Sequence, residues 1–89
     1  MKLLLSASFK KDFQKLPPSV KKKAERQLKT LSLNLSYPSL RVKKMKGEFG
    51  KLQFWEARID QFWRLSFQKV GDGIRFCRIG PHDRVLKSR

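Results

Sequence analysis

The spacing of apolar residues changes along this chain from a helical period to runs of alternation, and that change limits the possible folds. In the first part, apolar residues recur three or four positions apart, as they do along one face of a helix. These positions are Phe9, Phe13, Leu16, Val20, Ala24, Leu28, Leu31 and Leu35. After Leu52, within residues 55–59 and again within residues 63–67, apolar residues occupy every second position, as they do along one face of a strand. Helices followed by strands predict an α+β domain in which a sheet buries one face under the helices.

The helical part follows a short strand predicted at residues 2–6. Ser8 is expected to cap the first helix, because a serine hydroxyl can accept hydrogen bonds from the free amides of the first turn. Pro17-Pro18 interrupts this helix and starts a longer one, since proline is tolerated in the first helical turn. Tyr37-Pro38 ends the second helix. Its polar face is basic and carries Lys21, Lys22, Lys23, Arg26 and Lys29.

Three strands are predicted in the second part. The first two are joined at Asp60-Gln61, the turn Gly71-Asp72-Gly73 precedes a third at residues 74–79, and Gly80-Pro81 ends it. We therefore predict an N-terminal strand, two helices and a three-stranded antiparallel meander, forming one sheet packed on the helices. The inward positions are Trp55, Ala57, Ile59, Trp63, Leu65 and Phe67, and the outward positions are Phe54, Glu56, Arg58, Phe62, Arg64 and Ser66.

Charge indicates the kind of partner. The 89 residues leave room for one modest core, so residues 1–89 are expected to form a single domain. Lys and Arg number 22 against 7 Asp and Glu, a formal net charge of +15. A polyanion relieves the repulsion among these charges, which makes nucleic acid the expected partner and an acidic protein a second kind.

Other classes of protein are disfavoured by what the sequence lacks. No stretch approaches the length of a membrane-spanning helix, and Leu3-Leu4-Leu5 is too short for a signal peptide. The single Cys77 cannot form an internal disulfide and is expected to be a small buried hydrophobe. With one histidine, no zinc site can be built from Cys and His, and no metal or cofactor is expected. A reducing cytoplasm is the expected location.

The outward face of the predicted sheet gathers charged side chains. Alternation puts Arg64 on this face, and Arg58 and Glu56 share a face of the neighbouring strand. A basic connection over residues 40–51 leads into the sheet, and His82 follows the last strand. This connection has two apolar anchors, Val42 and Met45, and contributes the lysines Lys43, Lys44 and Lys46.

Such a surface holds groups that can cleave RNA without a metal. The reaction needs a base for the 2′-hydroxyl proton, cations for the charge that develops at the phosphate, and an acid for the leaving 5′-oxygen. Arginine presents a permanently charged planar fork to phosphate, and histidine can transfer a proton near neutral pH. Arg58, Arg64 and His82 are therefore candidate catalytic residues, although exposed arginines on a strand are more often a solvated face.

Residues 55–67, reading WEARIDQFWRLSF, resemble the RelE superfamily of bacterial toxins, which includes the RelE, HigB, YoeB and YafQ types. The resemblance covers nearly the whole chain, including a segment like VKKMKG before the sheet and an R-x5-R-L-x-[YF] hairpin. It implies the toxin of a type II toxin-antitoxin system: a metal-independent endoribonuclease that cuts messenger RNA, commonly within the ribosomal decoding site. It also implies a cognate antitoxin that wraps the toxin through an acidic, partly helical segment.

The resemblance implies roles for single residues. Arg64 matches the arginine that contacts the scissile phosphate, and Arg58 matches a second basic residue of the site. His82 falls where the family often places its terminal acid or base. The segment that holds messenger and ribosomal RNA is similar to the loop containing Lys43, Lys44 and Lys46.

The family's general base is the part that this sequence does not match. The loop before VKKMKG has no carboxylate, where some relatives keep a catalytic Glu. Glu56 could substitute as the base, or it could form a cross-strand ion pair with Arg58 or Arg64. Two other functions stay open. One is a ParE-like inhibitor of DNA gyrase without nuclease activity, and the other is a general RNA-binding domain that uses exposed aromatics such as Phe54 and Phe62.

Overall fold

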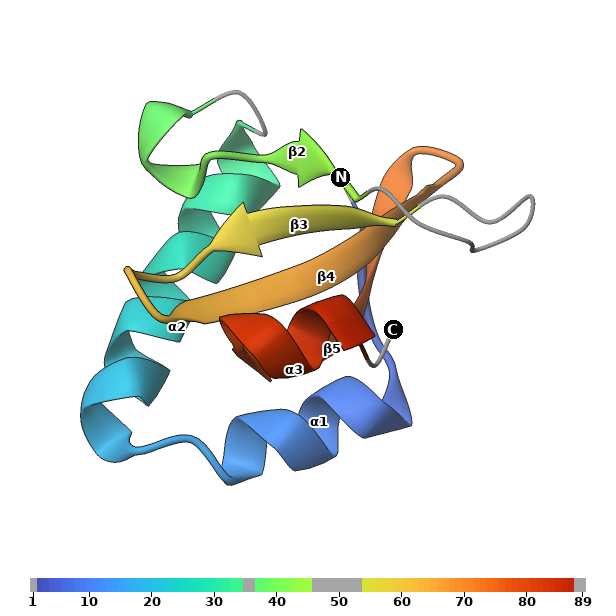
Figure 1. Ribbon diagram of the computed structural model, residues 1–89. Coiled ribbons are helices and arrows are strands. Elements are labelled where there is room, and N and C mark those ends of the chain that lie inside the picture. Colours follow the sequence, from blue (N-terminus) through green and yellow to red (C-terminus); the bar gives the residue numbers. More distant parts are fainter. Residues whose placement is uncertain (1, 35–36, 46–53, 88–89) are drawn as a thin grey trace.

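The computed structural model describes residues 2–34, 37–45 and 54–87 (Figure 1). The elements are β1 (Lys2–Leu5), α1 (Ala7–Gln14), α2 (Pro18–Leu33), a 3-10 turn η1 (Pro38–Leu40), β2 (Lys43–Lys44), β3 (Trp55–Arg58), β4 (Trp63–Val70), β5 (Gly73–Pro81) and α3 (His82–Lys87). The predicted order of one strand, two helices and three strands is confirmed, and β2, η1 and α3 are additions to it. Leu35, Lys46 and Leu52, on which predictions were made, lie outside the described residues.

The strands form one mixed sheet of five, in the order β1-β5-β4-β3-β2. Strands β3, β4 and β5 make the predicted antiparallel meander. The sheet is larger than this meander, because β1 pairs parallel with β5 and β2 pairs antiparallel with β3. Alternation could not predict either pairing. β2 consists of two lysines, and β1 reaches its parallel partner only after a long crossover through both helices and the meander.

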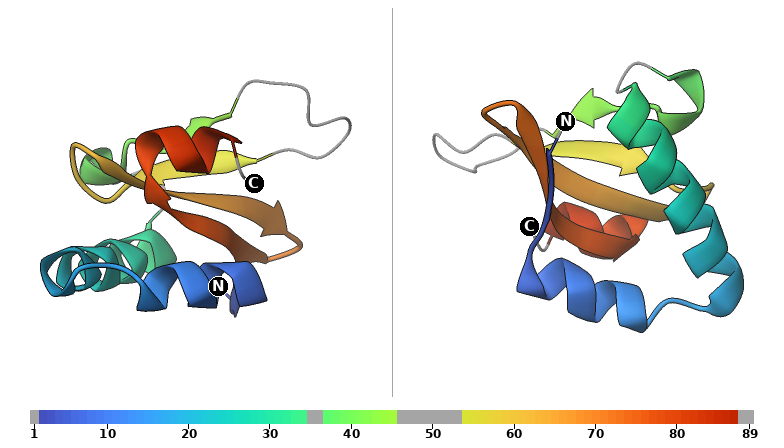
Figure 2. Two further views of the ribbon diagram at one scale, coloured as in Figure 1. Left: turned by 60° about the horizontal axis from the view of Figure 1, so that its bottom comes forward. Right: turned by 180° about the vertical axis from the view of Figure 1, so that it is seen from behind.

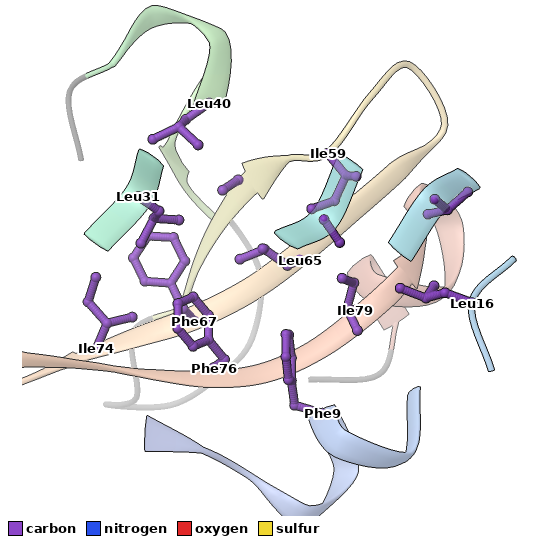
Figure 3. Packing of buried hydrophobic residues seen from close by; sticks show 13 residues of the cluster. Phe9, Leu16, Leu31, Leu40, Ile59, Leu65, Phe67, Ile74, Phe76 and Ile79 are labelled. Carbon is purple, nitrogen blue, oxygen red and sulfur yellow. The ribbon is translucent and has the colours of Figure 1, made fainter. Parts of the chain in front are cut away.

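Helices α1 and α2 cover one face of the sheet, and α3 lies on the other (Figure 2). The main core lies between the sheet and the first two helices, where Ala57, Leu65 and Phe67 are fully buried (Figure 3). The predicted inward positions of β3 and β4 are therefore confirmed. Helix α2 buries Val20, Ala24 and Leu31, and Leu28 packs against the same cluster while remaining partly exposed. The outward positions of β3 and β4 are left for polar and charged side chains.

Ser6, and not Ser8, caps helix α1. Its Oγ accepts a hydrogen bond from the N–H of Phe9 (3.0 Å) and donates one to the carbonyl of Cys77 (3.0 Å). The prediction of Ser8 as the cap was wrong because it considered only the helix. Ser6 also joins the helix to β5, so the helix begins where the chain leaves the sheet.

Asp12 of α1 binds the part of β5 that extends beyond β1. Its Oδ2 accepts hydrogen bonds from Nε of Arg78 (2.7 Å) and the N–H of Ile79 (3.2 Å), and its Oδ1 accepts one from Nη2 of Arg78 (3.0 Å). This carboxylate satisfies a main-chain donor of β5 that no strand satisfies. It fixes the end of β5, from which His82 leads into α3.

A second, smaller cluster contains Met45, Phe54 and Cys77. Met45 anchors the connection as predicted. Phe54 was expected to be an exposed aromatic but is 9% exposed, whereas Phe62 is 68% exposed, as expected. Cys77 is buried, and burial raises the pKa of its thiol, so its predicted role as a small hydrophobe is confirmed.

Candidate functional site

The turn between β3 and β4 is held by the side chain of Asp60. Its Oδ1 accepts hydrogen bonds from the N–H groups of Phe62 (2.9 Å) and Trp63 (3.0 Å), and its Oδ2 pairs with Nζ of Lys23 in α2 (3.2 Å). Burial by itself would raise the pKa of this carboxyl. The two amides and Lys23 outweigh burial and hold the pKa of Asp60 below its usual value.

The main-chain carbonyl of Asp60 joins the two predicted arginines. Nε of Arg58 donates to this oxygen (3.2 Å), and Nη1 of Arg64 donates to it as well as to the carbonyl of Trp63 (3.1 Å). Arg58 and Arg64 are also opposite each other in the register of β3 and β4. Since a guanidinium has five N–H donors, each arginine keeps further donors for a ligand.

The same two arginines line a pocket of about 270 Å³ together with Arg41, Lys43 and Glu56. Ala57 and Leu65 point into the main core, so their strand neighbours point to the face that is opposite α1 and α2. Four cationic side chains therefore surround one carboxylate on that face. Such a pocket can bind an anion with several oxygen acceptors, such as a phosphodiester.

Lys43 contributes to this pocket through an ion pair that was not predicted. Its Nζ lies 3.3 Å from Oε1 of Glu56, its register partner across β2 and β3. The expected cross-strand pairing of Glu56 with Arg58 or Arg64 was wrong, because the sequence did not reveal β2. Lys44 is exposed at the next position of β2 and does not line the pocket, and Lys46 lies outside the described residues.

Arg41 is a pocket residue that sequence reasoning missed. It follows η1 with a φ of 45°, and it is the one described residue other than glycine in the left-handed region. That conformation costs about 1–2 kcal/mol for a residue with a Cβ. No sequence pattern distinguished Arg41 from the basic residues around it.

His82 lies at the same end of the sheet as the Asp60 turn. Its N–H donates to the carbonyl of Phe62 (2.8 Å), and its side chain is 41% exposed, with Nδ1 3.5 Å from Oδ1 of Asp83. The lining of the Arg58–Arg64 pocket does not include it. The described structure thus brings Arg58, Arg64 and Lys43 together, and places His82 beyond the pocket lining.

Neither a metal-ligand group nor a membrane-spanning helix occurs in the part of the chain that the structure describes. No group of three or more His, Cys, Asp or Glu side chains that could hold a metal ion is found there. No helix there is long and apolar enough to cross a membrane.

The family of this chain is shown by its sequence. Residues 18–84 match the model of the ParE-like toxin domain, and the chain belongs to this family. It is a type II toxin of the RelE/ParE superfamily, so the resemblance found in residues 55–67 is confirmed at that level. No curated protein matches the sequence.

Solved structures of similar toxins share the fold. A copper-bound mutant toxin from Helicobacter pylori has a TM-score of 0.68 and 26% identity, over 96% of this chain and 98% of that one. RelE in its complex with RelB from Pyrococcus horikoshii has a TM-score of 0.73 and 19% identity, over 93% and 96%. A chain of the DinJ–YafQ complex from E. coli has a TM-score of 0.68 and 20% identity, over 96% and 97%.

Proposed function

We propose that this toxin is a metal-independent endoribonuclease that cleaves messenger RNA on the ribosome and thereby inhibits translation. The observation that supports this most is the pocket where Arg41, Lys43, Arg58 and Arg64 surround Glu56. It offers several cationic donors to one phosphodiester, and it has a carboxylate beside them. Membership of a toxin family supports a target whose damage stops growth.

Each predicted site residue has a task in this proposal. Arg58 and Arg64 bind the scissile phosphate and stabilise the charge that develops on it. Their shared carbonyl acceptor places both before substrate arrives, so little reorganisation is needed. His82 protonates the leaving 5′-oxygen, and Lys43, Lys44 and Lys46 hold the RNA backbone.

The net charge supports a second partner, an acidic antitoxin. A surface that binds RNA through its positive charge can be covered by a chain rich in carboxylates. The relatives from P. horikoshii and E. coli were crystallised with RelB and DinJ. We propose that a cognate acidic protein neutralises this toxin in the same way.

The test is cleavage of a messenger bound to the ribosome. Purified toxin is added to ribosomes programmed with a short synthetic messenger, and the cut is mapped from both ends of the RNA. We expect a cut with a 2′,3′-cyclic phosphate and a 5′-hydroxyl as its ends, formed in the presence of a chelator. An intact messenger in this assay, together with growth arrest on induction in cells, would contradict the proposal.

Membership of the ParE-like toxin domain family supports one alternative function. This alternative is the inhibition of DNA gyrase without cleavage of RNA. Supercoiling of plasmid DNA by purified gyrase distinguishes the two. A toxin that stops supercoiling and leaves the programmed messenger intact belongs to the alternative.

A further inference from the structure

We propose that Glu56 is the general base of the cleavage reaction and accepts the proton of the 2′-hydroxyl through its Oε2. This inference rests on the proposed ribonuclease function. It adds the group that starts the reaction, and it specifies that the substrate must be a ribonucleotide.

Glu56 is buried, and only one of its two carboxylate oxygens has a partner among the described residues. Its side chain is 3% exposed, and its Oε1 is engaged by Lys43 at 3.3 Å. Its Oε2 is buried and has no hydrogen-bond partner among the described residues. An unpaired buried carboxylate oxygen costs free energy, and because Glu56 lines the pocket, a ligand that brings a hydrogen-bond donor to this oxygen would relieve that cost.

The second evidence is the chemistry of the pocket lining. The other lining side chains are Arg41, Lys43, Arg58 and Arg64, and none of these can accept a hydrogen bond. Glu56 is therefore the single side-chain acceptor in the described lining. A ligand that satisfies the whole pocket must combine a negatively charged group with a hydroxyl donor. A phosphodiester beside a 2′-hydroxyl has both, and DNA lacks the hydroxyl.

In this mechanism each proton that is transferred has a donor and an acceptor. Oε2 of Glu56 takes the 2′-hydroxyl proton, the 2′-oxygen forms a bond to phosphorus, and the bond from phosphorus to the 5′-oxygen breaks. Arg58 and Arg64 stabilise the charge on the phosphate oxygens. His82 gives a proton to the leaving 5′-oxygen, and the products are a 2′,3′-cyclic phosphate and a 5′-hydroxyl. His82, which is outside the pocket lining, does not have to serve as both base and acid.

A purely structural role for Glu56 is the alternative, in which the carboxylate only holds Lys43. Ser66 provides a matched control for burial. It is the register partner of Glu56 on β4, it is fully buried, and its Oγ also has no partner among the described residues. It does not line the pocket. If an unpaired buried atom at this place mattered only for packing, both residues would affect stability alone.

The experiment uses the full chain and ribosomes programmed with two synthetic messengers. One messenger has the natural linkage, and the other has sulfur in place of the leaving 5′-oxygen, which leaves without needing a proton. Cleavage is measured in single turnovers at saturating toxin for wild type, Glu56→Gln, His82→Gln, Lys43→Met and Ser66→Ala. Affinity is measured with a messenger whose scissile nucleotide is 2′-deoxy and cannot be cut.

We expect Glu56→Gln to cleave both messengers more slowly than wild type by a factor of about a hundred or more, with an affinity near that of wild type. The sulfur linkage should restore His82→Gln but not Glu56→Gln, because it replaces an acid and not a base. Lys43→Met should lose affinity more than rate at saturation, and Ser66→Ala should cleave like wild type.

Three results would overturn the role of Glu56: a wild-type rate for Glu56→Gln, its restoration by the sulfur linkage, or an equal loss of rate at saturation in Lys43→Met. If Glu56→Gln does not fold, Glu56→Asp replaces it. That variant keeps the charge but withdraws the oxygen by one methylene, and a rate like wild type would also refute the role. A wild-type toxin that cuts neither messenger would instead refute the ribonuclease function itself.

Discussion

Arg58 and Arg64 donate hydrogen bonds to the same acceptor, the main-chain carbonyl oxygen of Asp60. Two groups of like charge are thus held side by side at paired positions of β3 and β4 through a neutral oxygen. The position of that oxygen depends on the turn, and the turn depends on the Asp60 side chain. The geometry of the Arg58–Arg64 pocket should therefore be sensitive to a residue that does not line it.

Replacing Asp60 tests this dependence. Asp60→Ala removes the acceptor of two main-chain amides, and we expect the free energy of unfolding to fall by about 2 kcal/mol, measured by urea denaturation. Asp60→Asn keeps an oxygen at the Oδ1 position, so it should lose less stability and retain more cleavage activity. An equal loss of stability in the two variants would show that the ion pair with Lys23 contributes more than the hydrogen bonds to the turn.

The lowered pKa of the Asp60 carboxyl predicts that the free energy of unfolding depends on pH in the acidic range. Its pKa in the folded state lies below the ordinary value of 3.8. Its contribution to stability is therefore fully present above that value and is lost as the pH falls through the lower, folded-state pKa. Thermal unfolding from pH 5 to pH 2 should show wild type losing more stability than Asp60→Asn. Parallel curves for the two proteins would contradict the assignment.

Sequence patterns predicted the meander and its two faces because alternation is a local property. Trp63, Leu65 and Phe67 had to share one face, so Arg64 had to lie on the other. The ion pair of Glu56 with Lys43 depends on β2, which contains two lysines and no apolar pattern. Arg41 enters the pocket through a left-handed backbone conformation that its sequence neighbours do not indicate. The parts of the site that were not predicted thus depend on a strand pairing and on a backbone conformation, and the spacing of apolar residues indicates neither.

Arg64 should be essential for cleavage and dispensable for folding. Arg64→Ala removes a donor to the transition state, and we expect the cleavage rate to fall about a hundredfold or more, with the thermal midpoint little changed. Arg75→Ala is the matched control, since Arg75 is an exposed arginine of β5 outside this pocket. An active Arg64→Ala, or an equal loss in Arg75→Ala, would remove Arg64 from the mechanism.

His82 should affect chemistry without affecting binding. His82→Gln keeps a similar size but cannot transfer a proton, so cleavage of the natural messenger should slow about a hundredfold or more while ribosome affinity stays near wild type. Asp83→Asn is the control, because Asp83 is the ionic neighbour of His82 and its side chain is almost fully exposed. Loss of ribosome affinity in His82→Gln would indicate a binding role instead.

Binding to the ribosome should weaken steeply with salt, since each phosphate that a lysine neutralises releases counterions. Every lysine in contact with single-stranded RNA contributes roughly 0.7 to the slope of log affinity against log salt. Lys44→Gln should lower this slope with no change in stability, because Lys44 is an exposed residue of β2.

Lys43→Gln should behave differently, because Lys43 pairs with the buried Glu56. The Lys43 side chain is 67% exposed, but its partner Glu56 is 3% exposed, so the substitution removes the ionic partner of a buried carboxylate. We expect the free energy of unfolding to fall by about 2 kcal/mol. The variant with Lys43, Lys44 and Lys46 all replaced should be less stable than Lys44→Gln, bind weakly and show the shallowest slope. An unchanged slope in this triple variant would place the RNA on another basic surface, such as the exposed face of α2.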